Sequence, residues 1–259
     1  MPSRALAAET WSGTIVLADG LVVYVGPGAT AARHRHDAIQ IIWSPDRPIV
    51  LGAELGSVIT HGAIIASREY HHFEANGAPV AIVLVEPAGR LGRRLNTIAQ
   101  RSPDLSELNI DVPLPVTTQP TVVVDWAHSL ITSITSDTVR PGRDGVRGEV
   151  REACRLIDAR LDDAPPLADT ASQVGYSPRQ LRRIFADEIG MPYRRYILWR
   201  RFRHALLAVR DGADLTTAAA AAGFADSAHF SRAFRQRFGL TPSEILPLLT
   251  VADADFVDD

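Results

Sequence analysis

Two segments in the first third of the chain contain histidines at spacings that suit metal binding. The first has His34 and His36, followed by Gln40, and the second has His71 and His72. Alternate residues of a β-strand face the same side, so His34 and His36 point the same way on a strand, and a histidine from a neighbouring strand can complete a three-nitrogen site. We predict His34, His36 and His72 as the ligands of any divalent metal.

The polar and aromatic side chains of these segments also suit a pocket for a small organic molecule. The candidate effector-binding residues are His34, His36, Gln40, Trp43, His71 and His72. The residues leave three alternatives open, namely a metal site, a small-molecule pocket, and histidines that serve only the structure.

Short apolar runs position these side chains. From about residue 13 to residue 86, runs rich in β-branched and aromatic residues are separated by turn residues, and Asp19-Gly20 lies between two such runs. An Asp-Gly pair in this setting indicates a hairpin, and several closely spaced strands indicate an antiparallel barrel or sandwich.

Residues 13–86 resemble the cupin fold. Metal-binding cupins use a His-x-His pair followed by Glu and a later His-x3-Asn; here His72 and Asn76 fit the second motif, whereas Gln40 stands in place of Glu. The resemblance implies a cupin-like β-barrel that binds an effector. A neutral glutamine in place of a carboxylate lowers the affinity for a hard divalent cation.

Helical periodicity follows the strand-rich region. Leu91, Leu95 and Ile98 share one helical face, and an apolar stripe runs along residues 121–136. This stripe can pack on the barrel of its own chain or on a second copy, and both alternatives stay open.

The C-terminal half contains an internal repeat. Residues 167–176 recur as 215–224, and residues 181–190 recur as 230–239. Each copy has the pattern of a short helix, a glycine that permits a sharp turn, a Ser or Asp that caps the next helix, and a second amphipathic helix. A helix of 18 residues over 193–210, about 27 Å long, is expected to join the two helix-turn-helix copies.

The helical half resembles the DNA-binding domain of AraC/XylS-type bacterial transcription regulators over most of residues 150–245. The motif GFADSAHFSRAFRQRFG at residues 223–239 carries this resemblance, together with Tyr196, Arg201 and Ala205 in the linking helix. It implies that each second helix is a recognition helix that binds double-stranded promoter DNA.

Residues 175–242 hold 12 Arg against five acidic residues, which suits phosphate binding. The outward positions of the two recognition helices give the candidate DNA contacts Arg179, Arg182, Arg183, Ser227, Ala228, Ser231, Arg232 and Arg235. Arg reads guanine bidentately whereas Ala offers only apolar contact, so we predict that the first module reads sequence more strongly than the second. For Arg183 and Arg232, an ion pair within the fold stays open as an alternative to a DNA contact.

The sequence thus predicts an α+β chain of 259 residues: an N-terminal cupin-like antiparallel β-barrel with flanking helices, and an all-α domain of two helix-turn-helix modules joined by a long helix. The expected bounds are 1–139 for effector binding and dimerisation, 140–148 for a linker, 149–250 for DNA binding and 251–259 for an acidic tail. The formal charge of −3 combines an acidic first half, a basic DNA-binding half and this tail.

We expect a cytoplasmic regulator of transcription and not an enzyme. The single cysteine, Cys154, excludes an internal disulfide, the N-terminus lacks a signal-peptide pattern and no apolar run suggests membrane association. Promoter DNA and a small-molecule effector are the expected partners, with RNA polymerase and a second copy as further candidates. The alternative is a metal-binding cupin that acts as a metal sensor, or as a metal-dependent enzyme with a DNA-binding appendage.

Overall fold

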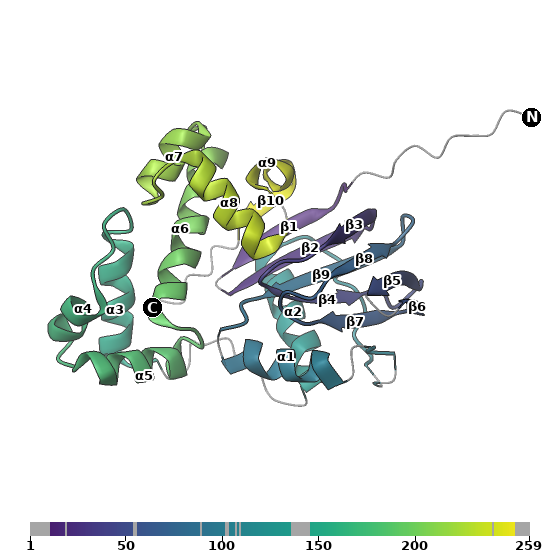
Figure 1. Ribbon diagram of the computed structural model, residues 1–259, viewed down its shortest axis with the longest axis horizontal. Helices are drawn as coiled ribbons and strands as arrows, with labels where there is room; N and C mark the ends of the chain where they lie inside the picture. Colours follow the sequence, from purple (N-terminus) through teal and green to yellow (C-terminus); the bar gives the residue numbers. More distant parts are fainter. Residues whose placement is uncertain are drawn as a thin grey trace, which may run out of the picture.

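The computed structural model has a β-rich N-terminal half and a helical C-terminal half (Figure 1). It describes residues 11–18, 20–53, 56–88, 90–101, 104–106, 108, 110–135, 146–239 and 241–251. One sheet has six strands in the order β10 (Leu249–Val251), β1 (Thr14–Ala18), β2 (Leu21–Pro27), β9 (Pro79–Val85), β4 (Ile39–Trp43) and β7 (Gly62–Ile65). The other has four, in the order β3 (Thr30–His34), β8 (His71–Glu74), β5 (Ile49–Ala53) and β6 (Gly56–Thr60).

The two sheets face each other without closing into a barrel. Neighbouring strands are antiparallel except β10, which runs parallel to β1, and each sheet keeps two edge strands. The predicted antiparallel architecture is confirmed in this coarser form, and the predicted closed barrel is wrong. Alternating apolar residues determine which face of a strand is buried, but they do not determine whether edge strands pair.

The six-stranded sheet is buried on both faces. Val16, Val23 and Ile41 face helices α1 (Arg90–Arg101) and α2 (Pro120–Thr135). The residues next to them in each strand point the other way and face the four-stranded sheet and the helical half. The apolar stripe of α2 is among the residues packed on this sheet. Of the two alternatives for that stripe, the structure therefore supports packing within its own chain.

The helical half has the predicted double helix-turn-helix. Its helices are α3 (Gly148–Asp158), α4 (Leu167–Gln173), α5 (Pro178–Glu188), α6 (Tyr193–Arg210), α7 (Leu215–Ala221), α8 (Ser227–Phe238) and α9 (Pro242–Ile245), followed by a 3₁₀ turn over Leu246–Leu248. Corresponding glycines have matching left-handed conformations, with φ of 76° at Gly175 and 77° at Gly223, and 78° at both Gly190 and Gly239. The sequence repeat is therefore also a conformational repeat.

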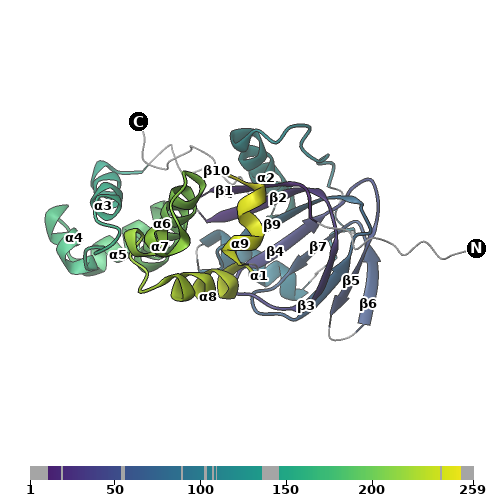
Figure 2. The same cartoon turned by 90° about the horizontal axis from the view of Figure 1, so that it is seen from above.

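The helical half packs against the sheets. Figures 1 and 2 show α8 and α9 between the other helices and the β-rich half, and one continuous apolar core includes residues of both halves. Residues 140–145 of the predicted linker and 252–259 of the predicted tail lie outside the described residues. Val146 is buried in the helical core and Val251 belongs to β10. The described part of the chain contains no helix with the length and apolarity of a membrane span.

Candidate DNA interface and its contacts with the sheets

Helix α5 presents the first group of candidate DNA contacts. Ser177 and Gln180 form a capping box at its N-terminus, while Leu181, Ile184 and Phe185 turn into the core. This arrangement leaves three arginines exposed on the outer face, Arg179, Arg182 and Arg183. The side chains of Arg179 and Arg182 make no hydrogen bond or ion pair with any other described residue, so their guanidinium groups are free to bind a nucleic acid.

Arg183 has a partner within its own helix. Its Nη1 lies 3.8 Å from Asp187 Oδ2, and both side chains are more than two-thirds exposed. An exposed pair at i,i+4 contributes little to stability, so this contact does not commit Arg183 to a structural role.

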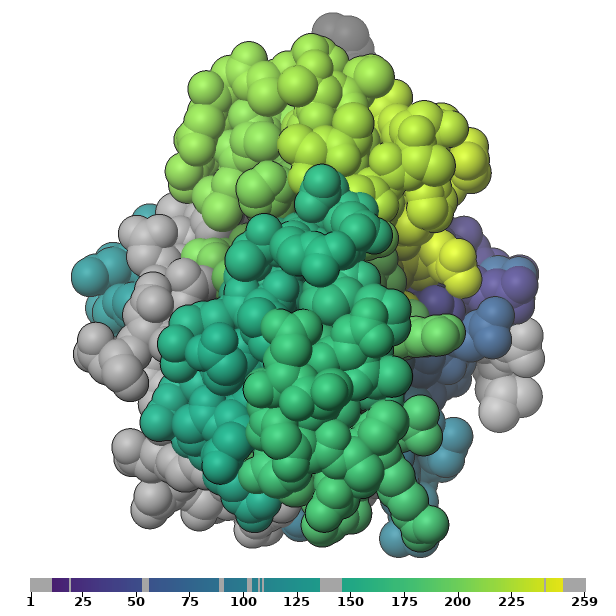
Figure 3. Space-filling model, turned by 90° about the vertical axis from the view of Figure 1, so that its left-hand side faces the viewer, coloured from purple at the N-terminus to yellow at the C-terminus, as the bar shows by residue number. Residues whose placement is uncertain are grey.

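Helix α8 presents the second group. Asp226 caps its N-terminus by accepting a hydrogen bond from the His229 amide, and Phe230 and Phe234 are buried. The predicted contact residues comprise half-buried Ser227 and Ser231 and exposed Ala228, Arg232 and Arg235. Neither arginine of this group pairs with another residue of the described chain. Figure 3 views the helical half from the side away from the sheets, where both modules reach the surface.

Two arginines of the linking helix α6 serve the fold. The Nε of Arg200 lies 2.9 Å from Asp158 Oδ1, and the Nε of Arg201 donates to the Leu161 carbonyl at 2.9 Å. These contacts hold α6 against α3 and the turn that follows it.

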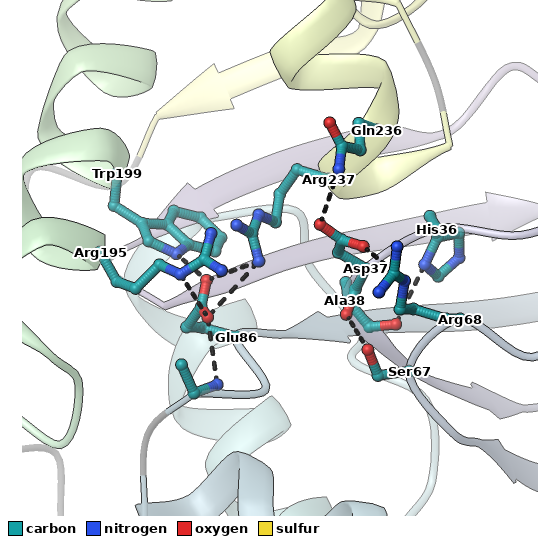
Figure 4. A network of polar contacts seen from close by, with 11 residues as sticks. His36, Asp37, Ala38, Ser67, Arg68, Glu86, Arg195, Trp199, Gln236 and Arg237 are labelled. Atoms are coloured by element: carbon teal, nitrogen blue, oxygen red, sulfur yellow. Dashed lines mark hydrogen bonds and ion pairs between the residues drawn. The ribbon is translucent and has the colours of Figure 1, made fainter.

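The C-terminal end of α8 is docked on the loop between β3 and β4. The amides of Asp37 and Ala38 donate to the carbonyls of Gln236 and Arg237 at 2.9 and 3.0 Å. Figure 4 shows a side-chain contact at the same place, from the Gln236 amide to the Asp37 carboxylate. These carbonyls lie in the last turn of α8, where backbone carbonyls have no hydrogen-bond donor within the helix. The β-rich half thus caps a recognition helix.

Glu86 and Arg237 form a buried ion pair between the halves. The Arg237 Nη1 lies 3.2 Å from Glu86 Oε2, and the two side chains are 4% and 3% exposed. Trp199 Nε1 also donates to this carboxylate at 2.9 Å, and the Ala88 amide donates to its other oxygen at 3.1 Å (Figure 4). Glu86 follows β9 directly, so the contact links the central sheet to α6 and α8.

Sequence reasoning missed this pair, although the repeat contains a signal for it. Arg237 of the second module corresponds to Glu188 of the first. Glu188 binds Arg147, with Oε1 3.0 Å from the arginine Nε. Arg237 and Glu188 thus occupy the same place in their helices and carry opposite charges. Each attaches its helix to a segment outside its module.

Three histidines converge beside the end of α8. Ring centroids of His34 and His71 are 4.3 Å apart, and that of His36 lies 5.6 and 5.3 Å from them. Burial lowers the pKa of His71 to about 3 and also lowers the pKa of His36, so both are neutral at pH 7. His71 belongs to this set, whereas the ring of His72 lies against Gly52. The predicted ligand His72 is not one of the three histidines that converge, because adjacent strand residues face opposite sides of a sheet.

A cavity of about 320 Å³ lies between the sheets and the helical half. Its lining is mostly apolar and comes from both halves, with Tyr24 and Phe73 on one side and Phe238 on the other, and His34 and Gln40 add polar groups. Of the six predicted effector contacts, His34 and Gln40 are among the lining residues of this cavity and the other four are not. His36 and His71 lie in the neighbouring histidine cluster, His72 faces Gly52, and Trp43 lies in the core with α2. Trp43 also donates its Nε1 hydrogen to the Val112 carbonyl.

Comparison with known proteins identifies the helical half. Residues 170–246 match the family described as a helix-turn-helix domain. A solved structure from Chromobacterium violaceum, described as a transcriptional regulator with an AraC-type DNA-binding domain, is 30% identical, covering 38% of this chain and 89% of that one with a TM-score of 0.36. The chain belongs to the AraC-type DNA-binding proteins.

Two further proteins resemble this AraC-type chain, one in part of its sequence and one in its fold. The uncharacterized helix-turn-helix regulator YidL of Escherichia coli K12 is 32% identical over 105 residues, 40% of this chain and 35% of that protein, so the chain spans about a third of YidL. ToxT of Vibrio cholerae, solved with an unsaturated fatty acid, is 16% identical over 89% of this chain and 96% of its own, with a TM-score of 0.46. YidL and the Chromobacterium violaceum protein are described as transcription regulators, as expected, and not as enzymes.

Proposed function

We propose that this AraC-type chain is a sequence-specific transcription regulator that binds promoter DNA through both modules and is controlled by a small molecule in the cavity between its halves. The observation that carries the first part is the set of exposed, unpaired arginines on two structurally equivalent recognition helices. Cytoplasmic location, contact with RNA polymerase and pairing with a second copy remain predictions.

The first module supplies the stronger sequence readout. Arg179 and Arg182 can each bind the O6 and N7 atoms of a guanine, and one such bidentate pair discriminates by about 1–3 kcal/mol. The corresponding face of α8 offers two hydroxyls and a methyl group through Ser227, Ser231 and Ala228, so phosphate contacts by Arg232 and Arg235 dominate there.

DNA binding is tested with fragments of the source genome selected on the purified full chain. On a selected fragment, fluorescence anisotropy of Arg182→Ala is expected to show affinity reduced about 5- to 100-fold and weaker discrimination against scrambled DNA. Ser227→Ala is expected to retain most of that discrimination. Arg210→Ala is the control, because Arg210 ends α6 and pairs with Asp211.

The opposite result for the two variants would contradict the proposal that the first module supplies the stronger sequence readout. Discrimination unchanged in Arg182→Ala and abolished in Ser227→Ala would assign the main readout to the second module. No selection of any genomic fragment by the wild-type chain would contradict DNA binding itself.

The cavity favours an apolar effector with one hydrogen-bonding end. Its walls are apolar apart from a few groups such as His34 and Gln40, and the Gln40 side-chain nitrogen is buried without a partner among the residues that the structure describes. Because the lining includes Phe238 and Gly239 at the end of α8, an effector there touches the recognition helix directly. Binding then shifts the population of the arrangement that binds DNA.

Thermal unfolding with a panel of apolar carboxylates, amides and alcohols tests the cavity. A bound molecule is expected to raise the melting temperature of the wild type and of Gln100→Leu, whose glutamine is exposed on α1. Gln40→Leu is expected to lose that shift. An equal shift in Gln40→Leu would place the effector elsewhere.

A further inference from the structure

Arginines gather at one place on the β-rich half. Residues 11–88 contain four arginines and no lysine. Three of the four are exposed and lie on β3, directly after β3, and in the turn between β7 and β8, namely Arg33, Arg35 and Arg68. The loop between β3 and β4 also holds the docked end of α8. A patch of arginines therefore borders the second recognition helix.

Tyr70 brings two of these arginines together. The guanidinium carbons of Arg33 and Arg35 lie 4.3 and 4.7 Å from the centroid of its ring. A guanidinium group is attracted to the face of an aromatic ring, so Tyr70 helps to order both side chains. The two positive charges also repel each other, and an anion that bridges them offsets this repulsion.

Arg68 is fixed in the same patch by its backbone and by its side chain. Its amide donates to the His36 carbonyl at 2.9 Å, and its φ of 68° is uncommon for a residue with a Cβ. Its Nε lies 3.5 Å from Asp37 Oδ1, and Gln236 of α8 donates to the other oxygen of that carboxylate at 3.4 Å (Figure 4). The Arg68 side chain is 71% exposed, so Asp37 positions this guanidinium group without burying it.

The patch continues the outward face of α8. Arg232 and Gln236 are four residues apart, so they share one face of the helix, and both are exposed. Gln236 contacts Asp37, and Asp37 contacts Arg68. In Figure 2, α8 and β3 lie at the same edge of the molecule. The exposed basic surface of the recognition helix therefore extends onto the β-rich half.

We propose that Arg33, Arg35 and Arg68 bind phosphates of the DNA backbone beside the groove that α8 enters. A recognition helix lies in the major groove, and phosphates line both sides of that groove. With Arg232 and Arg235 of α8, the surface offers five arginines, whereas its own segments contain two acidic residues, Asp37 and Glu69. The proposal rests on the proposed DNA binding by α8 and adds the β-rich half to the interface.

Phosphate contacts of this kind have a recognisable effect on affinity. A guanidinium group binds phosphate through two parallel hydrogen bonds, and this contact carries no sequence information. The patch therefore raises the affinity for every DNA sequence by the same factor, and discrimination stays with the recognition helices. Each phosphate contact also makes the affinity more sensitive to salt, because binding releases counterions from the DNA.

The test is fluorescence anisotropy of the full chain on a selected genomic fragment and on a scrambled fragment, over a range of salt concentrations. Each phosphate contact contributes about −0.9 to the slope of log affinity against log salt concentration. Arg33→Gln/Arg35→Gln is expected to lower the affinity for both fragments by the same factor, roughly 10-fold or more at 0.1 M salt, and to make the slope shallower by about two. Arg68→Gln is expected to make the slope shallower by about one.

Arg47→Gln/Arg101→Gln is the matched control, because it removes the same charge from two exposed positions outside the patch. Arg47 follows the opposite end of β4, and Arg101 ends α1, which packs on the other face of the six-stranded sheet. This variant is expected to bind both fragments as the wild type does. The melting temperatures of both double variants are expected to equal that of the wild type, since all four side chains are exposed.

The possible failures are distinguishable. Wild-type affinity and slope in Arg33→Gln/Arg35→Gln, or an equal loss in the control, would overturn this proposal and leave DNA binding by the modules standing. A loss confined to the selected fragment would also overturn it, because the arginines would then act through the position of the recognition helix. No binding of any fragment by the wild type would overturn the proposed function, and this proposal with it.

Discussion

Burial determines how the imidazole of His71 binds protons. The ring of His71 is enclosed and beside two other imidazoles, which lowers its pKa to about 3. A proton on this ring would meet low dielectric surroundings and, within the described part of the chain, no acceptor for its Nε2–H, so the folded chain keeps it neutral.

We predict that the metal-free chain loses stability as the pH falls below 6.5. The unfolded chain protonates His71 near pH 6.5 whereas the folded chain does so near pH 3, so between these values the unfolded state binds more protons. This group contributes a slope of up to about 1.4 kcal/mol per pH unit. Urea unfolding between pH 7 and pH 5 in chelator should show a shallower slope for His71→Gln than for wild type.

His72→Gln is the control for this prediction, because its ring lies on the other side of the same strand. It should keep the wild-type slope. Parallel slopes for wild type and His71→Gln would show that other groups, including the buried His36, account for the pH dependence.

At the scale of the element, α8 is held at both ends. Asp226 caps its N-terminus, and Gly239 ends it in a left-handed conformation beside the histidine rings. Gly190, two residues after the end of α5, has the same φ of 78° but open space around the position of a Cβ. The two corresponding helix ends therefore share their backbone conformation and differ in their surroundings, since only the end of α8 is packed against other side chains.

We predict that Gly239→Ala destabilises the chain more than Gly190→Ala. Both substitutions place a Cβ on a left-handed residue, which costs roughly 1–2 kcal/mol. Only Gly239→Ala also pushes against His34 and His36, so its free energy of unfolding should fall further. Urea unfolding of the two variants checks this, and equal losses would contradict the close contact of α8 with the histidines.

At the scale of the molecule, the Glu86–Arg237 pair links the two halves in the apolar core. Both side chains are almost fully enclosed, and Trp199 adds a hydrogen bond from α6. A buried ion pair contributes little when both partners are replaced together by apolar residues, but removing one partner leaves a buried charge unpaired.

We predict that Glu86→Leu and Arg237→Leu each lower the free energy of unfolding by about 3–5 kcal/mol. The double variant should recover part of this loss, because no buried charge is then left without its partner. Arg195, whose Nε lies 4.0 Å from Glu86 Oε1, is 41% exposed and can be solvated. Chemical unfolding of the wild type and the three variants gives the coupling energy. Additive losses would show that the two side chains do not stabilise each other.

The sequence by itself determined the helical half. Its repeat, capping residues and glycines predicted both modules and the helix of residues 193–210, because these signals act between residues a few positions apart. The same periodicity predicted that Leu181, Phe185, Phe230 and Phe234 turn inward, and all four are buried. Exposed arginines on the opposite face followed from that geometry.

Only the tertiary structure decided how the halves meet. The open edges of the sheets, the choice of His71 over His72, and the Glu86–Arg237 pair depend on residues up to 151 positions apart in the chain. Local patterns carry no information on such pairings, since strand register and packing of whole elements select them. Sequence therefore predicted the exposed arginine faces of α5 and α8, and three-dimensional packing placed the histidines beside the end of α8.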